Sequence, residues 1–375
     1  MDKIWAHSGD SHFLEPADLY QSILPPDLAE RMPRAVKDPD GAFETVYIDG
    51  ESFRRPMPRP EQEEFYAASV RAPGSGDVQL RLRDLDAEGI WGELVFPSLG
   101  MWNASIKDPG LLREGIRAAN DWALKEIQGA SPRFVIAAQV PLRVVDDAVA
   151  ELQRLASVGA KAVFLPTTPP SSDDYNRDSW EPLWDAAAES NMVIAFHIGT
   201  DPIDLLSGEL PGVTFRGPGG AVLNHTETTF SGQRAVMKLV AGGALDRHPS
   251  VKVLVSEGGA SWVPFLGDRM NEAYRQHGMM VRPKLSRSPK EILYSQVYAS
   301  FQHDESATSA LTANGYRNVM WGSDYPHLEG TYGHTQETLH ELFDDLDEAD
   351  RDRITIGSFL DLFPEVGLPP AVAAS

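Results

Sequence analysis

The sequence predicts a single-domain α/β protein, a (β/α)8 TIM-like barrel. Eight short apolar segments rich in β-branched residues recur along the 375 residues, and amphipathic helical patterns separate them. Parallel strands joined by crossover helices must be covered on both faces, and eight such units close naturally into a barrel. With 42% hydrophobic residues, the chain is long enough to enclose one large core. A doubly wound open sheet is the alternative fold.

Each predicted strand is a short apolar run followed by a helical pattern or a long loop. In chain order, the strand segments are residues 4–13, 89–98, 135–142, 160–167, 192–198, 251–258, 297–302 and 318–325. Between them, residues 111–128, 144–159 and 180–190 carry apolar residues three and four positions apart, which is the spacing of an amphipathic helix. Strand and helix therefore alternate almost throughout.

Two irregular stretches interrupt this alternation within the one domain, residues 1–375. Residues 25–76, rich in Pro, Arg and acids, follow the first strand, and residues 200–220, rich in Gly and Pro, follow the fifth. Long loops in compact domains are usually lids or binding segments, so we expect both to lie over the active site. They could instead be surface insertions. The tail, residues 366–375, is expected to be disordered.

Composition excludes several functional classes. The chain has no cysteine, so any metal must be held by nitrogen and oxygen ligands, and thiol nucleophiles are excluded. Its formal net charge of −22 argues against nucleic-acid binding, which needs clustered Lys and Arg. There is no signal-peptide pattern at the start and no apolar run near 18 residues. We expect a cytoplasmic protein that does not enter the membrane.

Histidines and carboxylates stand where predicted strands end. In a (β/α) barrel the carboxyl ends of the strands meet at one mouth, where catalytic groups lie. The residues at or just beyond these ends are Asp10, His12, His197, Glu257, His303 and Asp324. Such side chains suit apolar strand ends poorly unless they are paired or bound to metal. Imidazole and carboxylate together favour Zn²⁺, Fe²⁺ or Mn²⁺ over Ca²⁺.

Structural roles are open for several of these residues. Glu257 precedes two glycines and could cap the helix that follows, while His303, beside an aspartate, could be a loop histidine. His225 lies outside any predicted strand and could simply be exposed. His327 could orient a ligand through a hydrogen bond or lie at the surface.

Five motifs resemble those of the amidohydrolase superfamily. They are DSHFLEP (10–16), FHIGT (196–200), NHTETTFSGQ (224–233), SEGGASWVPFLGDRM (256–270) and WGSDYPHLEGTY (321–332). The resemblance runs almost from end to end and is to the amidohydrolase-related branch that includes the aminocarboxymuconate-semialdehyde and resorcylate decarboxylases. It implies a metal held by Asp10, His12, His197 and Asp324, with Glu15 as a further candidate ligand.

The chain departs from the branch's pattern at two positions. His225 replaces a tyrosine of the usual N-Y-x-E-T pattern, and His303 stands where a pair of acids is usual after strand seven. Both changes add an imidazole, and two ions side by side need ligands of their own. We therefore expect a dinuclear site in which Glu257, His225 and His303 also bind metal. Asp324, His225 and Glu257 are the expected catalytic residues.

Three reactions suit such a site: hydrolysis, non-oxidative decarboxylation, and oxygen activation by two irons. The favoured hypothesis is a di-iron monooxygenase that hydroxylates a hydrophobic small molecule in secondary metabolism. A terpenoid hydroxylase of platensimycin and platencin biosynthesis is a precedent on an amidohydrolase-like fold. A metal hydrolase or a decarboxylase of a small organic acid is the alternative. The expected cofactor is one or two divalent ions, with Fe ahead of Zn or Mn, and the resemblance implies a homodimer.

Overall fold

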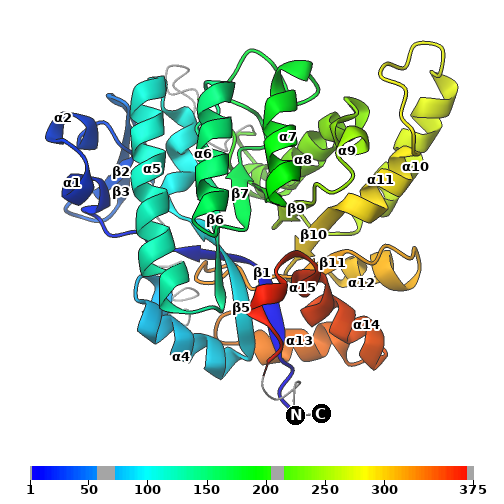
Figure 1. Ribbon diagram of the computed structural model, residues 1–375. Helices are drawn as coiled ribbons and strands as arrows, with labels where there is room; N and C mark the ends of the chain where they lie inside the picture. The colour runs from blue at the N-terminus through cyan, green and yellow to red at the C-terminus, as the bar shows by residue number, and fades with distance from the viewer. Residues whose placement is uncertain (1, 57–71, 204–214, 370–375) are drawn as a thin grey trace.

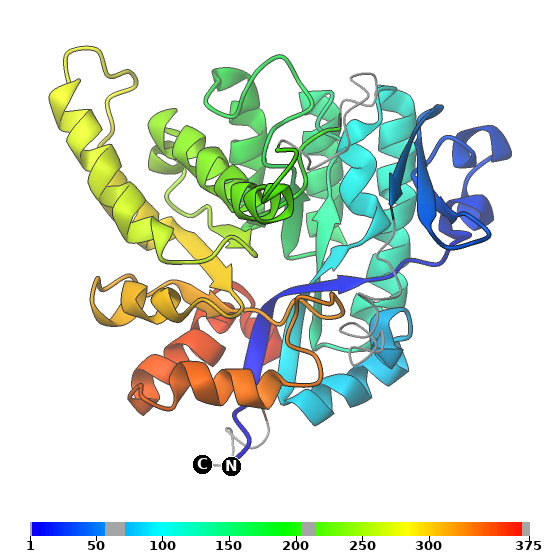
Figure 2. The same ribbon diagram turned by 180° about the vertical axis from the view of Figure 1, so that it is seen from behind.

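The computed structural model describes residues 2–56, 72–203 and 215–369. Eight parallel strands follow one another around a barrel, and helices surround them (Figures 1 and 2). The strands are β1 (Ala6–Phe13), β5 (Ile90–Pro97), β6 (Phe134–Gln139), β7 (Ala162–Leu165), β8 (Val193–His197), β9 (Val253–Ser256), β10 (Val297–Phe301) and β11 (Val319–Trp321). Each overlaps one predicted segment, so the predicted fold is confirmed.

The barrel closes at its carboxyl end, between β1 and the residues that follow β11. Ser11 pairs with Tyr325 in a parallel bridge, and the Asp324 amide donates to the Asp10 carbonyl at 3.0 Å. Gly322 permits this approach, because a Cβ there would lie 2.8 Å from the Cβ of Asp10. The seam of the barrel therefore brings Asp10 next to Asp324.

Strand residues pack alternately outward and inward, as expected for strands buried on both faces. In β6, Ile136 packs in the layer between strands and helices, whereas Val135 and Ala137 join the cluster inside the barrel. Phe359 and Phe363 extend this inner cluster from the C-terminal segment. The barrel is thus a filled core with polar residues gathered at one mouth.

The covering helices begin where the sequence provides caps. Asp108, for example, accepts hydrogen bonds from two backbone amides of the first turn of α5, and Pro109 stands at its first position. The helices are α1 (Leu19–Ile23), α2 (Pro26–Ala29), α4 (Val78–Glu88), α5 (Pro109–Glu126), α6 (Val145–Ser157), α7 (Glu181–Ser190), α8 (Gly220–Ala241), α9 (Ala244–Arg247), α10 (Trp262–Gln276), α11 (Pro289–Gln296), α12 (Glu305–Thr312), α13 (Thr335–Phe343), α14 (Glu348–Asp352) and α15 (Ser358–Leu362). Shorter helical turns are Pro73–Ser75, Leu99–Ser105, Gln128–Ala130, Asp178–Trp180, Arg353–Gly357 and Pro364–Val366. None of the described helices is long and apolar enough to cross a membrane.

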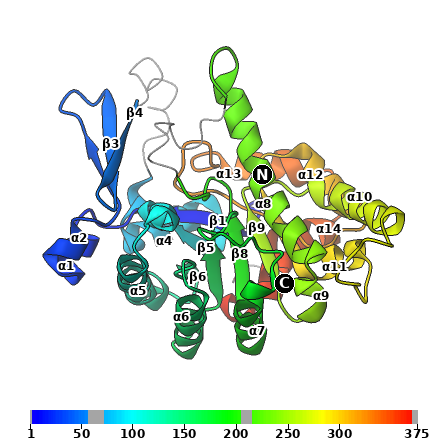
Figure 3. The same ribbon diagram turned by 90° about the horizontal axis from the view of Figure 1, so that it is seen from above.

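The insertion after the first strand is more ordered than its composition indicates. It contains an antiparallel sheet of β2 (Arg34–Lys37), β3 (Phe43–Ile48) and β4 (Glu51–Pro56). Buried and half-exposed residues alternate along β3, which is the pattern of a strand with one covered face. Figure 3 shows this sheet and the start of α8 projecting beyond the barrel on the same side.

Parts of the two predicted loops and of the tail lie outside the described residues. These parts are residues 57–71, 204–214 and 370–375. Residues 366–369, which we expected to belong to a disordered tail, are placed against the barrel, and Val366 is buried in the inner cluster. The expectation for residues 370–375 stays a prediction.

Candidate metal centre

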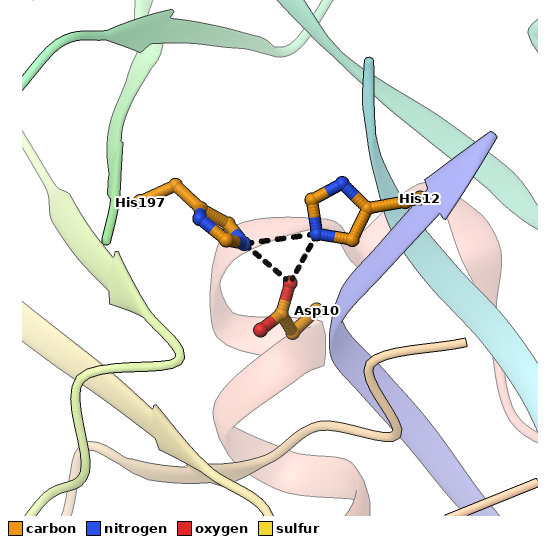
Figure 4. A group of neighbouring side chains, drawn as sticks. All are labelled: Asp10, His12 and His197. Atoms are coloured by element: carbon orange, nitrogen blue, oxygen red, sulfur yellow. Dashed lines mark hydrogen bonds and ion pairs between the residues drawn. The ribbon is translucent and has the colours of Figure 1, made fainter. Parts of the chain in front are cut away.

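Two histidines and an aspartate point toward one another at the mouth of the barrel (Figure 4). Asp10 and His12 come from the end of β1, and His197 is the last residue of β8. The Nε2 atoms of His12 and His197 lie 3.0 Å apart, and Asp10 Oδ1 lies 3.2 Å from Nε2 of His197 and 3.8 Å from Nε2 of His12. All three side chains are buried. They form a compact group with the geometry to hold a metal ion.

The contacts of the two Nδ1 atoms indicate the tautomer and the orientation of each imidazole. His12 Nδ1 lies 3.2 Å from the Pro97 carbonyl, and His197 Nδ1 lies 2.8 Å from the Ile198 carbonyl. Because a carbonyl only accepts, each Nδ1 carries a hydrogen and each Nε2 of a neutral ring presents an electron pair. Two electron pairs facing each other at 3.0 Å need a cation or a proton between them. This arrangement is the one that metal-binding histidines adopt.

Two further carboxylates complete the cluster. Asp324, after β11, places Oδ1 3.6 Å from Nε2 of His12, and Glu257, after β9, places Oε2 3.4 Å from Nε2 of His197. The Oδ2 atoms of Asp10 and Asp324 are buried without a hydrogen-bond partner. Buried carboxylate oxygens are seldom left unpaired. The donor set therefore fits a divalent cation of the kind that nitrogen and oxygen ligands prefer.

Without such a cation, Glu257 and Asp324 have raised pKa values and hold their protons more tightly than usual. Burial, together with the charges of Asp324 and Asp10, raises the pKa of Glu257 well above its usual value. Burial also raises the pKa of Asp324 to about 6, although His327 opposes the shift. Burial lowers the pKa of His12, whereas the carboxylates of Asp10 and Glu257 outweigh burial at His197 and raise its pKa to about 10. A bound cation would replace these protons.

Strained backbone marks two of these residues. Glu257 and Asp324 have φ values of 59° and 52°, in the left-handed region that non-glycine residues rarely adopt. Such strain costs about 1–3 kcal/mol per residue and persists where surrounding contacts enforce it. Both side chains point to the cluster from these positions, which is consistent with a functional role.

His327 lies at the edge of the cluster and is not a separate surface residue. Its Nδ1 lies 2.8 Å from Asp324 Oδ1, and its ring stacks on that of His12 with centroids 4.2 Å apart. The side chain is 38% exposed. It therefore orients Asp324, and together with His12 and Asp324 it forms a further group whose atoms could hold a metal ion.

Three of the predicted metal ligands lie outside this cluster. Glu15 is half-buried, and its carboxylate accepts hydrogen bonds from the backbone amides of residues 98–100. His303 is exposed two residues beyond the end of β10, with Nε2 3.3 Å from the Glu329 carbonyl. His225 is exposed near the start of α8. Among the described residues, no group able to hold a metal includes any of the three.

An ion pair behind His12 was not anticipated from the sequence. Arg81 of α4 and Glu93 of β5 are fully buried, with Nε and Oε2 2.8 Å apart. Arg81 Nη1 also donates to the His12 carbonyl at 2.7 Å. The guanidinium lies over the Tyr325 ring, 4.5 Å from its centroid. Arg81 therefore ties the end of β1 to the residues after β11.

Known proteins resemble this chain over most of its length. The Amidohydrolase family model matches residues 91–357, which is more than half of the chain. Decarboxylase yanB of Aspergillus niger is 22% identical over 370 residues, covering 94% of this chain and 88% of the fungal protein.

Solved structures share the fold. The amidohydrolase map2389c of Mycobacterium avium subsp. paratuberculosis superposes with a TM-score of 0.76 at 19% identity, covering 99% of this chain and 100% of the other. A dihydroxybenzoic acid decarboxylase of Polaromonas sp., with bound manganese and the inhibitor 2-nitroresorcinol, superposes with a TM-score of 0.64 at 17% identity, covering 97% and 98%. Family match and fold agree with the resemblance in the motifs, and the chain belongs to the amidohydrolase family.

Proposed function

We propose that this enzyme removes CO₂ from a small carboxylic acid without oxidation, using one divalent ion. The observation that carries the proposal is the group of Asp10, His12 and His197, whose ligand atoms lie together at the barrel mouth, with Asp324 Oδ1 3.6 Å from His12 Nε2. The similarity to the Aspergillus decarboxylase, over nearly the whole of both chains, supports this reaction. The manganese in the Polaromonas enzyme supports a divalent ion such as Mn²⁺, with Zn²⁺ equally suited to these ligands.

The bound ion would act as a Lewis acid that orients the substrate's carboxylate or a neighbouring hydroxyl. Asp324 is the proposed proton donor, because its carboxylate lies beside His12 at the centre of the cluster and its Oδ2 has no partner in the described structure. Its proton goes to the carbon that bears the carboxylate. The bond to that carboxylate breaks, its electron pair remains with the carbon, and CO₂ leaves. His327 holds Oδ1 of Asp324 and leaves Oδ2 free to reach the substrate.

Hydroxylation by two irons was the hypothesis favoured by the sequence, and the structure gives it less support than decarboxylation. It depended on His225 and His303 as ligands of a second ion. His303 instead contacts the Glu329 carbonyl, and neither side chain joins a metal-binding group in the described part of the chain. We therefore propose decarboxylation, which needs only one ion.

The experiment is a turnover assay on protein loaded with Mn²⁺ or Zn²⁺, using a panel of hydroxybenzoic acids and related aromatic acids. The expected result is CO₂ release with or without oxygen, and its loss in Asp324→Asn. Oxygen consumption with a hydroxylated product, or hydrolysis of esters or lactones without CO₂ release from any acid, would overturn the proposal.

A further inference from the structure

A cavity of about 460 Å³ opens beside the metal centre, with Glu257 on its wall. It lies between α8, α10 and the ends of β8, β9 and β10. Its volume is within the range of small-molecule sites. Since Glu257 also contacts His197 at 3.4 Å, a ligand in the cavity lies next to the cluster.

The walls suit a flat ring. Phe230 comes from α8, and Trp262 and Phe265 come from α10. The indole of Trp262 is held in place, because its Nε1 donates to the Gly259 carbonyl at 2.7 Å. Gly258 and Gly259 contribute wall without side chains. Aromatic side chains beside bare backbone leave room for a planar group.

The polar lining of this cavity combines the carboxylates of Glu257 and Asp304 with uncharged amide and hydroxyl groups and the imidazole of His225. Asp304 lines it, and among the described residues its carboxylate has no hydrogen bond or ion pair. The carboxylate reaches the glycine wall, since a Cβ on Gly259 would lie 3.5 Å from Asp304 Oδ1. Beside it, the buried Nε2 of Gln302 lacks a partner. No Lys or Arg contributes to the described lining.

We propose that Asp304 determines specificity by selecting aromatic monocarboxylic acids that carry an amino or hydroxyl group at the end remote from the reacting carboxylate. The inference rests on the proposed decarboxylation and adds the class of substrate. A hydrogen-bond donor on the ring pairs with the free Asp304 carboxylate, because hydrogen bonds to a charged acceptor are stronger than those between neutral groups. A second carboxylate at that place meets Asp304, with no Lys or Arg in the described lining to neutralise it, and like charges in contact reject a ligand. Phe230 and Trp262 hold the ring between these two ends.

The experiment compares three salicylates that carry an amino, a hydroxyl or a carboxylate group opposite the reacting carboxylate. KM and kcat are measured on the metal-loaded enzyme, and calorimetry measures binding of the same compounds. Wild type is expected to bind the amino and hydroxyl compounds at least about tenfold more tightly than the dicarboxylate. Asp304→Asn is expected to raise KM for those two by about fivefold, lower it for the dicarboxylate and leave kcat unchanged. Asp185→Asn, which removes an exposed carboxylate on α7 outside the cavity, is the control.

The two proposals fail in different ways. If none of the compounds releases CO₂ but calorimetry gives the expected order and the Asp304→Asn effect, decarboxylation is wrong and the specificity of the cavity stands. If wild type binds the dicarboxylate as tightly as the others, or Asp304→Asn shifts all three alike, the assignment of Asp304 is wrong. A changed kcat with constant KM would also overturn it.

Discussion

Replacing Arg81 with methionine tests how the fold holds His12 in place. The Arg81–Glu93 pair is fully buried, and the substitution removes a 2.8 Å contact with Glu93 and a 2.7 Å contact with the His12 carbonyl. Breaking a buried pair by removing one partner costs about 3–5 kcal/mol, because the other charge is left buried without compensation. We expect the free energy of unfolding, measured in urea at neutral pH, to fall by about that amount. Adding Glu93→Gln should recover part of it.

The pH dependence of this loss is predictable. Burial raises the pKa of Glu93, against the opposing charge of Arg81, so the pKa rises further when Arg81 is gone. A carboxyl whose folded pKa exceeds its unfolded value stabilises the fold less as pH rises above the unfolded value of about 4.5. The deficit of Arg81→Met should therefore be small near pH 4 and full at pH 7, and the double variant should lack this dependence. A deficit below about 1 kcal/mol, or a double variant no more stable than the single, would refute the reasoning.

Three further predictions concern the cluster and the buried His7 of β1. His197→Ala should lose bound metal and activity, whereas His225→Ala should keep the wild-type metal content in elemental analysis; loss of metal from His225→Ala would restore the case for a second ion. His327→Gln should keep the metal but lower kcat/KM by about tenfold to a hundredfold, because Asp324 loses its orienting partner; unchanged turnover would contradict this. His7 is buried, and burial lowers its pKa to about 3 although the Gly367 backbone opposes the shift, so the unfolded state gains a proton first as pH falls below 6.5. His7→Phe should match wild type at pH 7 and be more stable by about 3 kcal/mol at pH 4 in urea denaturation, and an equal response to pH in both proteins would disprove it.

Strand position was enough to predict most of the cluster. Parallel strands of a barrel end at one mouth, so Asp10, His12, His197 and Asp324 could be brought together from their places in the chain alone. Glu257 follows the same rule, although capping of α10 was an equal possibility. The left-handed backbone at Glu257 could not be predicted, because glutamate rarely adopts it, and aspartate adopts it too seldom for Asp324 to signal it.

The prediction was weaker for residues just past the strands. Glu15 lies two residues beyond β1, where exposed backbone amides at residues 98–100 compete for its carboxylate. His303 lies equally far beyond β10, and its exposed imidazole contacts the Glu329 carbonyl instead of the cluster. Glu93 offered a signal that we did not use: a charged residue within an apolar strand buried on both faces requires a partner, and Arg81 is that partner.

Anomalous diffraction from crystals of the manganese-loaded protein tests the central claim most directly. The account predicts one peak, within bonding distance of Nε2 of His12 and of His197, with carboxylate oxygens of Asp10 and Asp324 around it. A crystal without a peak among these four side chains, or with a second peak held by His225 and His303, would contradict it.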